Sequence, residues 1–170
     1  MFYAEQCFKH AQAAAEYVLQ NKIEEDNPVF YPLIAAVYVL YGRPFKNSFG
    51  VGSLGEEIIP PGHLELHRLL LKHRDRIYAH TDATNFELPD VGQANQVGVV
   101  VSPTEKRLFG TQFCARPPLL PDVINLCQSL QKKTEYHVCK LFERYVKHVP
   151  NEVGKYVINI SNQAGSFFTR

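Results

Sequence analysis

The fold of this chain is decided by residues 122–148, which read DVINLCQSLQKKTEYHVCKLFERYVKH. Apolar and small residues recur in this stretch at spacings of three and four, the period of one face of an α-helix. The positions that share this face are Val123, Cys127, Leu130, Thr134, Val138, Leu141 and Tyr145. A helix of about 26 residues is about 39 Å long. We therefore predict a long helix that packs against other helices of the chain or against a second copy.

Three more helices are predicted upstream of this stretch. Residues 1–22 carry apolar and small side chains at the same spacing and form an amphipathic helix. Residues 29–41 are apolar almost all round, so this helix is expected at the centre of the bundle. A third helix is predicted for residues 62–79. Its buried stripe holds Leu66, Leu70, His73, Ile77 and His80.

The β-structure is expected to be small. Residues 97–114 alternate around a Ser-Pro turn, and residues 155–170 alternate again, which is typical of short strands or hairpins. The sequence thus predicts a mainly α fold, a bundle of about four helices with one or two small β-hairpins. Residues 1–170 are expected to form a single domain, since this length buries an ordinary core.

Composition limits the classes of function. The formal charge is only +1, with 18 basic and 17 acidic residues, so contact with nucleic acid must come from a local patch. The four cysteines contain no CxxC pair, and Cys127 and Cys139 would lie about 18 Å apart on one helix, too far for a disulfide. Reduced cysteines, no export signal and no apolar run long enough for a bilayer predict a cytoplasmic protein that does not enter a membrane.

Residues 74–80, which read RDRIYAH, are the chemically most informative segment. They place two arginines and a histidine within two helical turns. A guanidinium group offers a planar charged fork for phosphate oxygens, and an imidazole transfers protons near neutral pH. The segment predicts a site suited to phosphate chemistry, without defining a substrate.

Arg74, Asp75 and His80 fit the Arg-x(4-6)-His signature of HEPN domains. The wider stretch HRDRIYAHTD, residues 73–82, resembles the HEPN-like proteins of abortive-infection and phage-defence systems, in which this segment closes a helix of an all-α bundle. The resemblance implies a metal-independent endoribonuclease of a defence or toxin-antitoxin system. It further implies a homodimer whose two motifs face each other, with RNA as substrate and an antitoxin or another protein as partner. His80 would handle protons and Arg74 would hold the scissile phosphate, with no metal and no cofactor.

The motif departs from its family in one residue. Many active members carry Asn or His directly after the arginine, where this chain has Asp75. Asp75 could oppose RNA, orient His80 or pair with Arg76, and these roles stay open, as does a supporting role for Asp82. In a regular helix Arg76 lies one turn before His80 while Arg74 is displaced by about 120°. Local geometry thus favours Arg76 as the partner of His80, and the resemblance favours Arg74.

Each candidate residue has a structural alternative. Arg43, Arg68 and Lys72 are candidate phosphate-binding residues, but they equally fit a solvated surface. Basic side chains at a helix end also satisfy the terminal carbonyl groups. His63 and His67 have a metal-binding spacing but lack a third ligand, so no metal site is predicted. The alternative function is a non-catalytic HEPN-like helical module that binds a protein or a nucleotide.

Overall fold

The computed structural model describes residues 1–47, 53–75, 97–110, 119–149, 151–154, 157–158 and 168–169. Within these ranges the chain is mainly α, as predicted. The four α-helices are α1 (Phe2–Gln20), α2 (Phe30–Gly42), α3 (Leu64–His73) and α4 (Leu120–Tyr145). Short 3-10 turns flank them, namely η1 (Arg43–Phe45), η2 (Glu56–Ile58), η3 (Pro61–His63) and η7 (Val146–His148).

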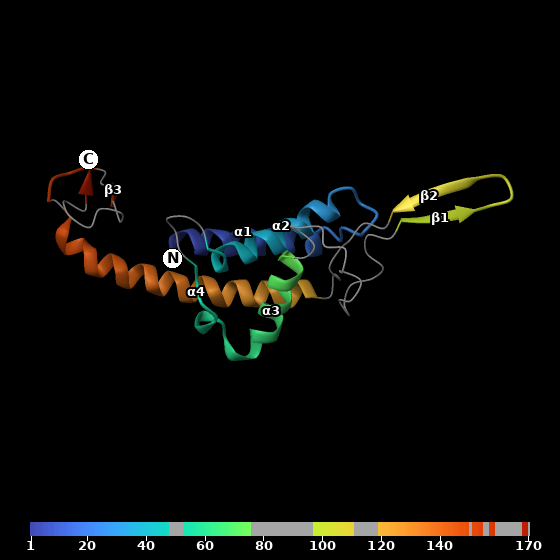
Figure 1. Cartoon of the computed structure of the whole chain (residues 1–170). Coiled ribbons are helices and arrows are strands. Elements are labelled where there is room, and N and C mark those ends of the chain that lie inside the picture. Colours follow the sequence, from blue (N-terminus) through green and yellow to red (C-terminus); the bar gives the residue numbers. More distant parts are fainter. Residues whose placement is uncertain are drawn as a thin grey trace.

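The helix at the centre of the bundle is α1, which packs extensively against both α2 and α4 (Figure 1). The prediction that helix 29–41 occupies the centre is therefore wrong. The buried face of α1 is rich in alanine, and small side chains let two neighbouring helices approach the same helix closely. The buried residues of α1 are Ala4, Cys7, Phe8, Ala11, Ala15 and Val18. Those of α2 are Phe30, Ile34, Val37, Tyr38, Tyr41 and Gly42.

The connection between α1 and α2 begins with a Schellman motif. The amide of Ile23 donates to the carbonyl of Val18 at 3.0 Å, and the amide of Lys22 donates to that of Leu19 at 3.2 Å. Lys22 adopts a left-handed backbone with φ 48°. The side chain of Asn27 then accepts a hydrogen bond from the amide of Val29 at 3.0 Å, which helps to start α2.

Helix α3 starts later than predicted, because Pro61–His63 forms a 3-10 turn before it. Its buried side chains are His67, Leu70 and His73, and it packs against α2. Arg74 follows α3 with helical backbone angles, and its amide donates to the carbonyl oxygens of Leu70 and Leu71. Residues 76–79 of the predicted helix lie outside the described residues.

Helix α4 confirms the predicted long helix, and it divides into two halves. The first half buries its apolar stripe against α1, including Val123, Cys127 and Leu130. The second half extends beyond the bundle (Figure 1), and Leu141 and Phe142 are 44% and 61% exposed there.

Two small antiparallel pairs complete the described structure. Strand β1 (Val97–Val101) pairs with β2 (Lys106–Gly110), and this hairpin projects away from the helices (Figure 1). Strand β3 (Val157–Ile158) pairs with β4 (Phe168–Thr169). The predicted hairpins are thus confirmed for these residues, while residues 111–114 lie outside the described ranges. Among the helices described, none has the length and apolar character needed to cross a bilayer.

Cys7, Cys127 and Cys139 are free thiols, as their spacing predicts. Cys7 and Cys127 are buried, and Cys139 is exposed. Burial raises the pKa of Cys127 to about 12, so this thiol stays protonated and behaves as a small apolar side chain. Cys114 lies outside the described residues.

Candidate functional site

The candidate site forms where the C-terminal ends of α2 and α3 meet. Gly42, the last residue of α2, lies directly against the aliphatic stem of Arg74. A Cβ atom on residue 42 would stand 3.1 Å from Cγ of Arg74 and 3.4 Å from Cδ2 of Leu71. Glycine at this position therefore allows α3 to approach α2 and leaves the side chain of Arg74 only 20% exposed.

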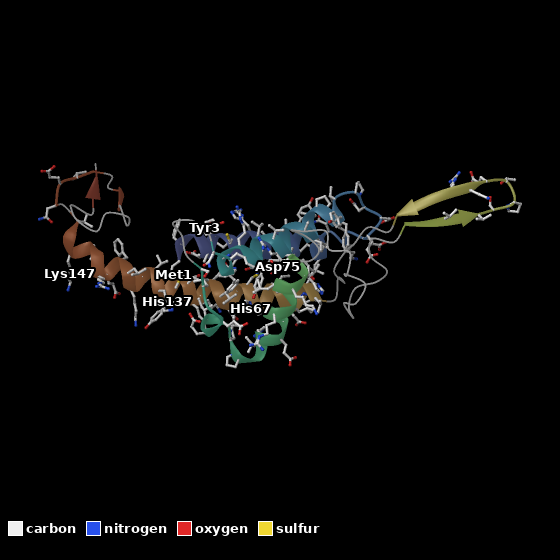
Figure 2. All side chains as sticks on the ribbon, in the orientation of Figure 1. Met1, Tyr3, His67, Asp75, His137 and Lys147 are labelled. Atoms are coloured by element: carbon white, nitrogen blue, oxygen red, sulfur yellow. The ribbon has the colours of Figure 1, made fainter. Side chains whose placement is uncertain are left out.

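Asp75 joins two cationic side chains at this point. Nη1 of Arg74 donates to Oδ1 of Asp75 at 2.7 Å, and Nζ of Lys46 donates to Oδ2 at 2.5 Å. Burial alone would raise the pKa of Asp75, but these two hydrogen bonds outweigh it and hold the pKa below its usual value. The carboxylate is thus ionised at neutral pH and neutralises one of the two cations. Figure 2 labels Asp75 at the end of α3.

Asp75 orients the guanidinium of Arg74 but occupies only part of its hydrogen-bonding capacity. Its Nη1 is held by Asp75, whereas its Nε is buried and has no hydrogen-bond partner among the described residues. An arginine fixed in this way binds a phosphate group at low entropic cost, because its side chain is already ordered. The three groups Lys46, Arg74 and Asp75 keep one net positive charge, which suits an anionic ligand.

Asp75 pairs with Arg74 and Lys46 in this structure, and the open alternatives that it orients His80 or pairs with Arg76 involve residues that are not described. Arg76, His80 and Asp82 lie outside the described residues, and their predicted roles stay predictions. Arg74 keeps α-helical backbone angles, φ −54° and ψ −49°, and its amide donates to the carbonyl oxygen of Leu70. The displacement of about 120° between Arg74 and His80 that a regular helix implies stays a prediction, because residues 76–80 lie outside the described residues.

The three predicted phosphate-binding residues do not form one cluster. Arg68 donates two hydrogen bonds to the carboxylate of Glu56, at 3.1 and 2.8 Å. Lys72 lies one turn after Arg68 and about 200° around the helix from Arg74, and its side chain is exposed. Arg43 places its guanidinium 6.0 Å from the ring centre of Tyr3 on α1.

Lys46 is the member of the site that the sequence did not predict. It follows η1, and 29 positions separate it from Asp75. No local spacing pattern links two residues so far apart. Only the packing of α3 against α2, through Gly42, brings them together.

The histidines of α3 belong to the core. His67 has no exposed surface, and its Nδ1 lies 2.8 Å from the hydroxyl oxygen of Tyr41. Its ring meets that of Phe45 edge-on at 4.5 Å. His73 stacks on Tyr38 with ring centres 5.7 Å apart. In the described part of the chain, no three His, Cys, Asp or Glu side chains converge as a metal site would require.

Comparisons of the chain with protein-family models, with curated proteins and with solved structures gave no match. The function of this protein is therefore inferred from its own residues and their geometry.

Proposed function

We propose that this protein is a HEPN-like, metal-independent endoribonuclease in which Arg74 holds the scissile phosphate and His80 transfers protons. The observation that carries the proposal is the ordered cationic group at the start of the motif. Asp75 orients Arg74 through one carboxylate oxygen, and Lys46 forms an ion pair with the other oxygen.

The chemistry of RNA cleavage fits this set of residues. A 2′-hydroxyl nucleophile needs a base to remove its proton, and an imidazole performs this near neutral pH. The phosphorane that forms carries extra negative charge, which a preorganised cation stabilises. Asp75 does not oppose RNA in this scheme, because its charge is already compensated by Lys46 and Arg74.

The proposal includes a homodimer with the two motifs facing each other, and a place in a phage-defence or toxin-antitoxin system. A neutralising antitoxin protein would then be a natural partner. These points follow from the resemblance of residues 73–82 to HEPN-like proteins. RNA would bind through a local cationic group, because the formal charge of the whole chain is only +1.

The test is cleavage of a mixed cellular RNA pool by the purified protein in the presence of a chelator. We expect His80→Ala and Arg74→Met each to lower cleavage by about a hundredfold or more. Methionine retains much of the volume that packs against Gly42 but removes the hydrogen-bond donors. The matched control is Arg107→Met on β2, whose side chain is 74% exposed and pairs with Glu105.

Thermal unfolding of all variants is measured in parallel. Cleavage by the parent protein together with equal cleavage by Arg74→Met would refute the assignment of Arg74. No cleavage by the parent protein would contradict the enzyme and favour the alternative, a non-catalytic HEPN-like module that binds a protein or a nucleotide.

A further inference from the structure

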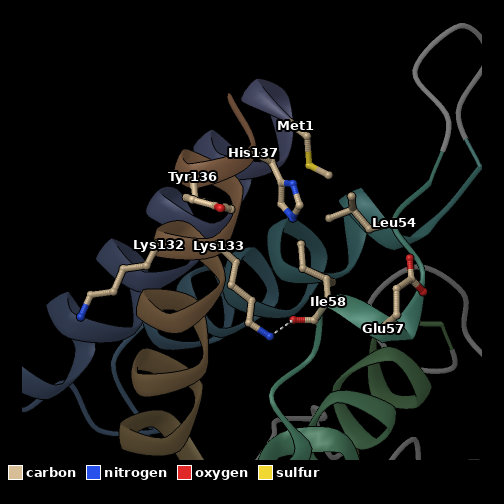
Figure 3. Close-up of a pocket in the computed structure, with 8 residues that line it drawn as sticks. All are labelled: Met1, Leu54, Glu57, Ile58, Lys132, Lys133, Tyr136 and His137. Carbon is tan, nitrogen blue, oxygen red and sulfur yellow. Dashed lines mark hydrogen bonds between the residues drawn. The ribbon is translucent and has the colours of Figure 1, made fainter. Parts of the chain in front are cut away.

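The lysines at the cavity between α4 and η2 do not converge on it. Nζ of Lys133 donates to the carbonyl oxygen of Ile58 at 2.9 Å and so ties η2 to α4, and the ammonium group of Lys132 points away from the cavity (Figure 3). The β1–β2 hairpin is a different kind of surface, because it projects away from the helices (Figure 1). Its backbone and side chains are therefore open to an interaction partner.

Strand β1 exposes apolar side chains on both of its faces. Val99, Val100 and Val101 are 56%, 54% and 66% exposed, and successive side chains of a strand point to opposite faces. Strand β1 pairs with β2 on one side, and among the described residues no strand lies on its other side. An isolated two-stranded hairpin is only marginally stable in water and needs further strands or a covering surface. These features indicate that β1 has a partner at its open edge.

The hydrogen bond that closes the turn determines which backbone groups of β1 face this open edge. The amide of Ser102 donates to the carbonyl oxygen of Glu105 at 2.9 Å, and the two strands continue in register from this pair. Hydrogen-bonded and non-hydrogen-bonded pairs alternate along an antiparallel ladder, so the backbone groups of Val100 point toward β2. The residues whose amide and carbonyl groups point to the open edge are Val97, Val99 and Val101.

The charges of the hairpin distinguish its two edges. Strand β2 begins with Lys106 and Arg107, which are both exposed, and charged side chains, lysine above all, protect an edge strand from pairing with other strands. Strand β1 reads VGVVV and carries no charge, so its edge lacks this protection. Two β1 strands can therefore pair without bringing like charges together, and the cationic β2 strands then lie at the outer edges of the combined sheet.

We propose that β1 pairs antiparallel with β1 of a second copy of this chain, so that the two hairpins form one continuous sheet. A two-fold axis at Val99 places Val99 opposite its own copy and Val97 opposite Val101 of the second copy. In this register the free amide and carbonyl groups of both strands bond to each other. Both copies use the same surface, so the contact closes as a dimer. The inference does not depend on the ribonuclease proposal, because it uses neither the Arg74 motif nor RNA.

The experiment is disulfide cross-linking of the full chain through an introduced cysteine. Cys139 is exposed, so the background carries Cys139→Ser together with Cys114→Ser. Oxidation of Val99→Cys with copper phenanthroline is expected to give a covalent dimer, because opposite residues of a hydrogen-bonded pair have Cα atoms about 5.5 Å apart, a distance that a disulfide spans. The yield is read from a non-reducing gel over time.

Val100→Cys in the same background is the matched control, because Val100 is equally exposed but lies about 8 Å from its own copy in this register, too far for a disulfide. We expect Val99→Cys to cross-link at least about tenfold faster than Val100→Cys. Adding Val101→Pro to Val99→Cys is expected to abolish the difference, because proline removes an amide that faces the open edge and leaves the bonds between β1 and β2 intact.

Equal rates for Val99→Cys and Val100→Cys would overturn the proposal, as would an unchanged rate after Val101→Pro. Absence of cross-linking in both cysteine variants would also overturn it and would leave the edge of β1 to a strand of a different protein. Arg74→Met in the Val99→Cys background is expected to cross-link at the unchanged rate, so the ribonuclease proposal and this one fail independently.

Discussion

His67 gives the clearest single-residue test of how the core tolerates charge. The side chain has no exposed surface, and burial lowers its pKa. An unfolded histidine has a pKa of about 6.5, so the folded state favours neutral His67 and binds fewer protons at mildly acidic pH. The free energy that this residue contributes is therefore complete above about pH 6.5 and is lost as the pH falls toward the lower folded-state pKa.

We expect His67→Gln to flatten the fall of unfolding free energy between pH 7.5 and pH 5. Glutamine does not titrate, yet it can still hydrogen-bond the hydroxyl of Tyr41. The measurement is urea unfolding at several pH values, and the control is His10→Gln, since His10 is exposed. An equal pH dependence in the parent protein and in His67→Gln would show that His67 does not resist protonation.

At single positions the sequence predicted part of the candidate site. It singled out Arg74 and Asp75 because their residue types and spacing are local information. It missed Lys46, whose contact with Asp75 spans 29 positions. It weighed His67 only as a metal ligand, predicted no metal site, and did not place the residue in the core, although His67 lies three positions before the buried Leu70. That spacing of three was the available signal that His67 faces the core.

At the end of α1, the residue type is unfavourable for the backbone conformation. Lys22 occupies the left-handed position of a Schellman motif with φ 48°. A residue with a side chain pays about 1–2 kcal/mol in this conformation, whereas glycine does not. We expect Lys22→Gly to raise the unfolding free energy by about 1 kcal/mol and Tm by about 2–4 °C.

Calorimetry or thermal circular dichroism measures this change. The neighbouring Asn21→Gly is the matched control, because Asn21 has φ −92° and gains nothing from glycine. Its side chain also donates to the carbonyl of Tyr17 at 2.9 Å, a bond that glycine removes. A stabilisation by Asn21→Gly equal to that by Lys22→Gly would show that the backbone conformation of residue 22 is not the cause.

Elements with strong local signals were predicted well. The predicted bounds of α1, α2 and α4 lie within one to three residues of those observed, because apolar spacing, proline and turn residues act over a few positions. The central place of α1 was not predicted, since it depends on how closely its alanine face lets two other helices approach. The close approach of Arg74 to Gly42 likewise follows from the packing of α3 on α2 rather than from a sequence pattern.

At the scale of the whole molecule, α4 has a first half that is buried in the core and a second half that is exposed. Residues as far as Thr134 pack in the core, whereas Tyr136 and Phe142 are 56% and 61% exposed. The two halves have the same backbone hydrogen bonds, but only the first must break core packing in order to open. Local opening of the second half therefore costs less free energy, and its amides should exchange with solvent faster.

We expect hydrogen exchange in dilute protein to show at least about tenfold less protection for residues 137–145 than for residues 123–134. Amides of α1 provide the internal reference, because this helix contacts both α2 and α4. Equal protection along α4 in dilute protein would contradict the expectation. Repeating the measurement at rising protein concentration reports on self-association. The apolar stripe of α4 is long enough for a second copy to cover the exposed half. In that case the protection of residues 137–145 increases with concentration, while that of residues 123–134 stays constant.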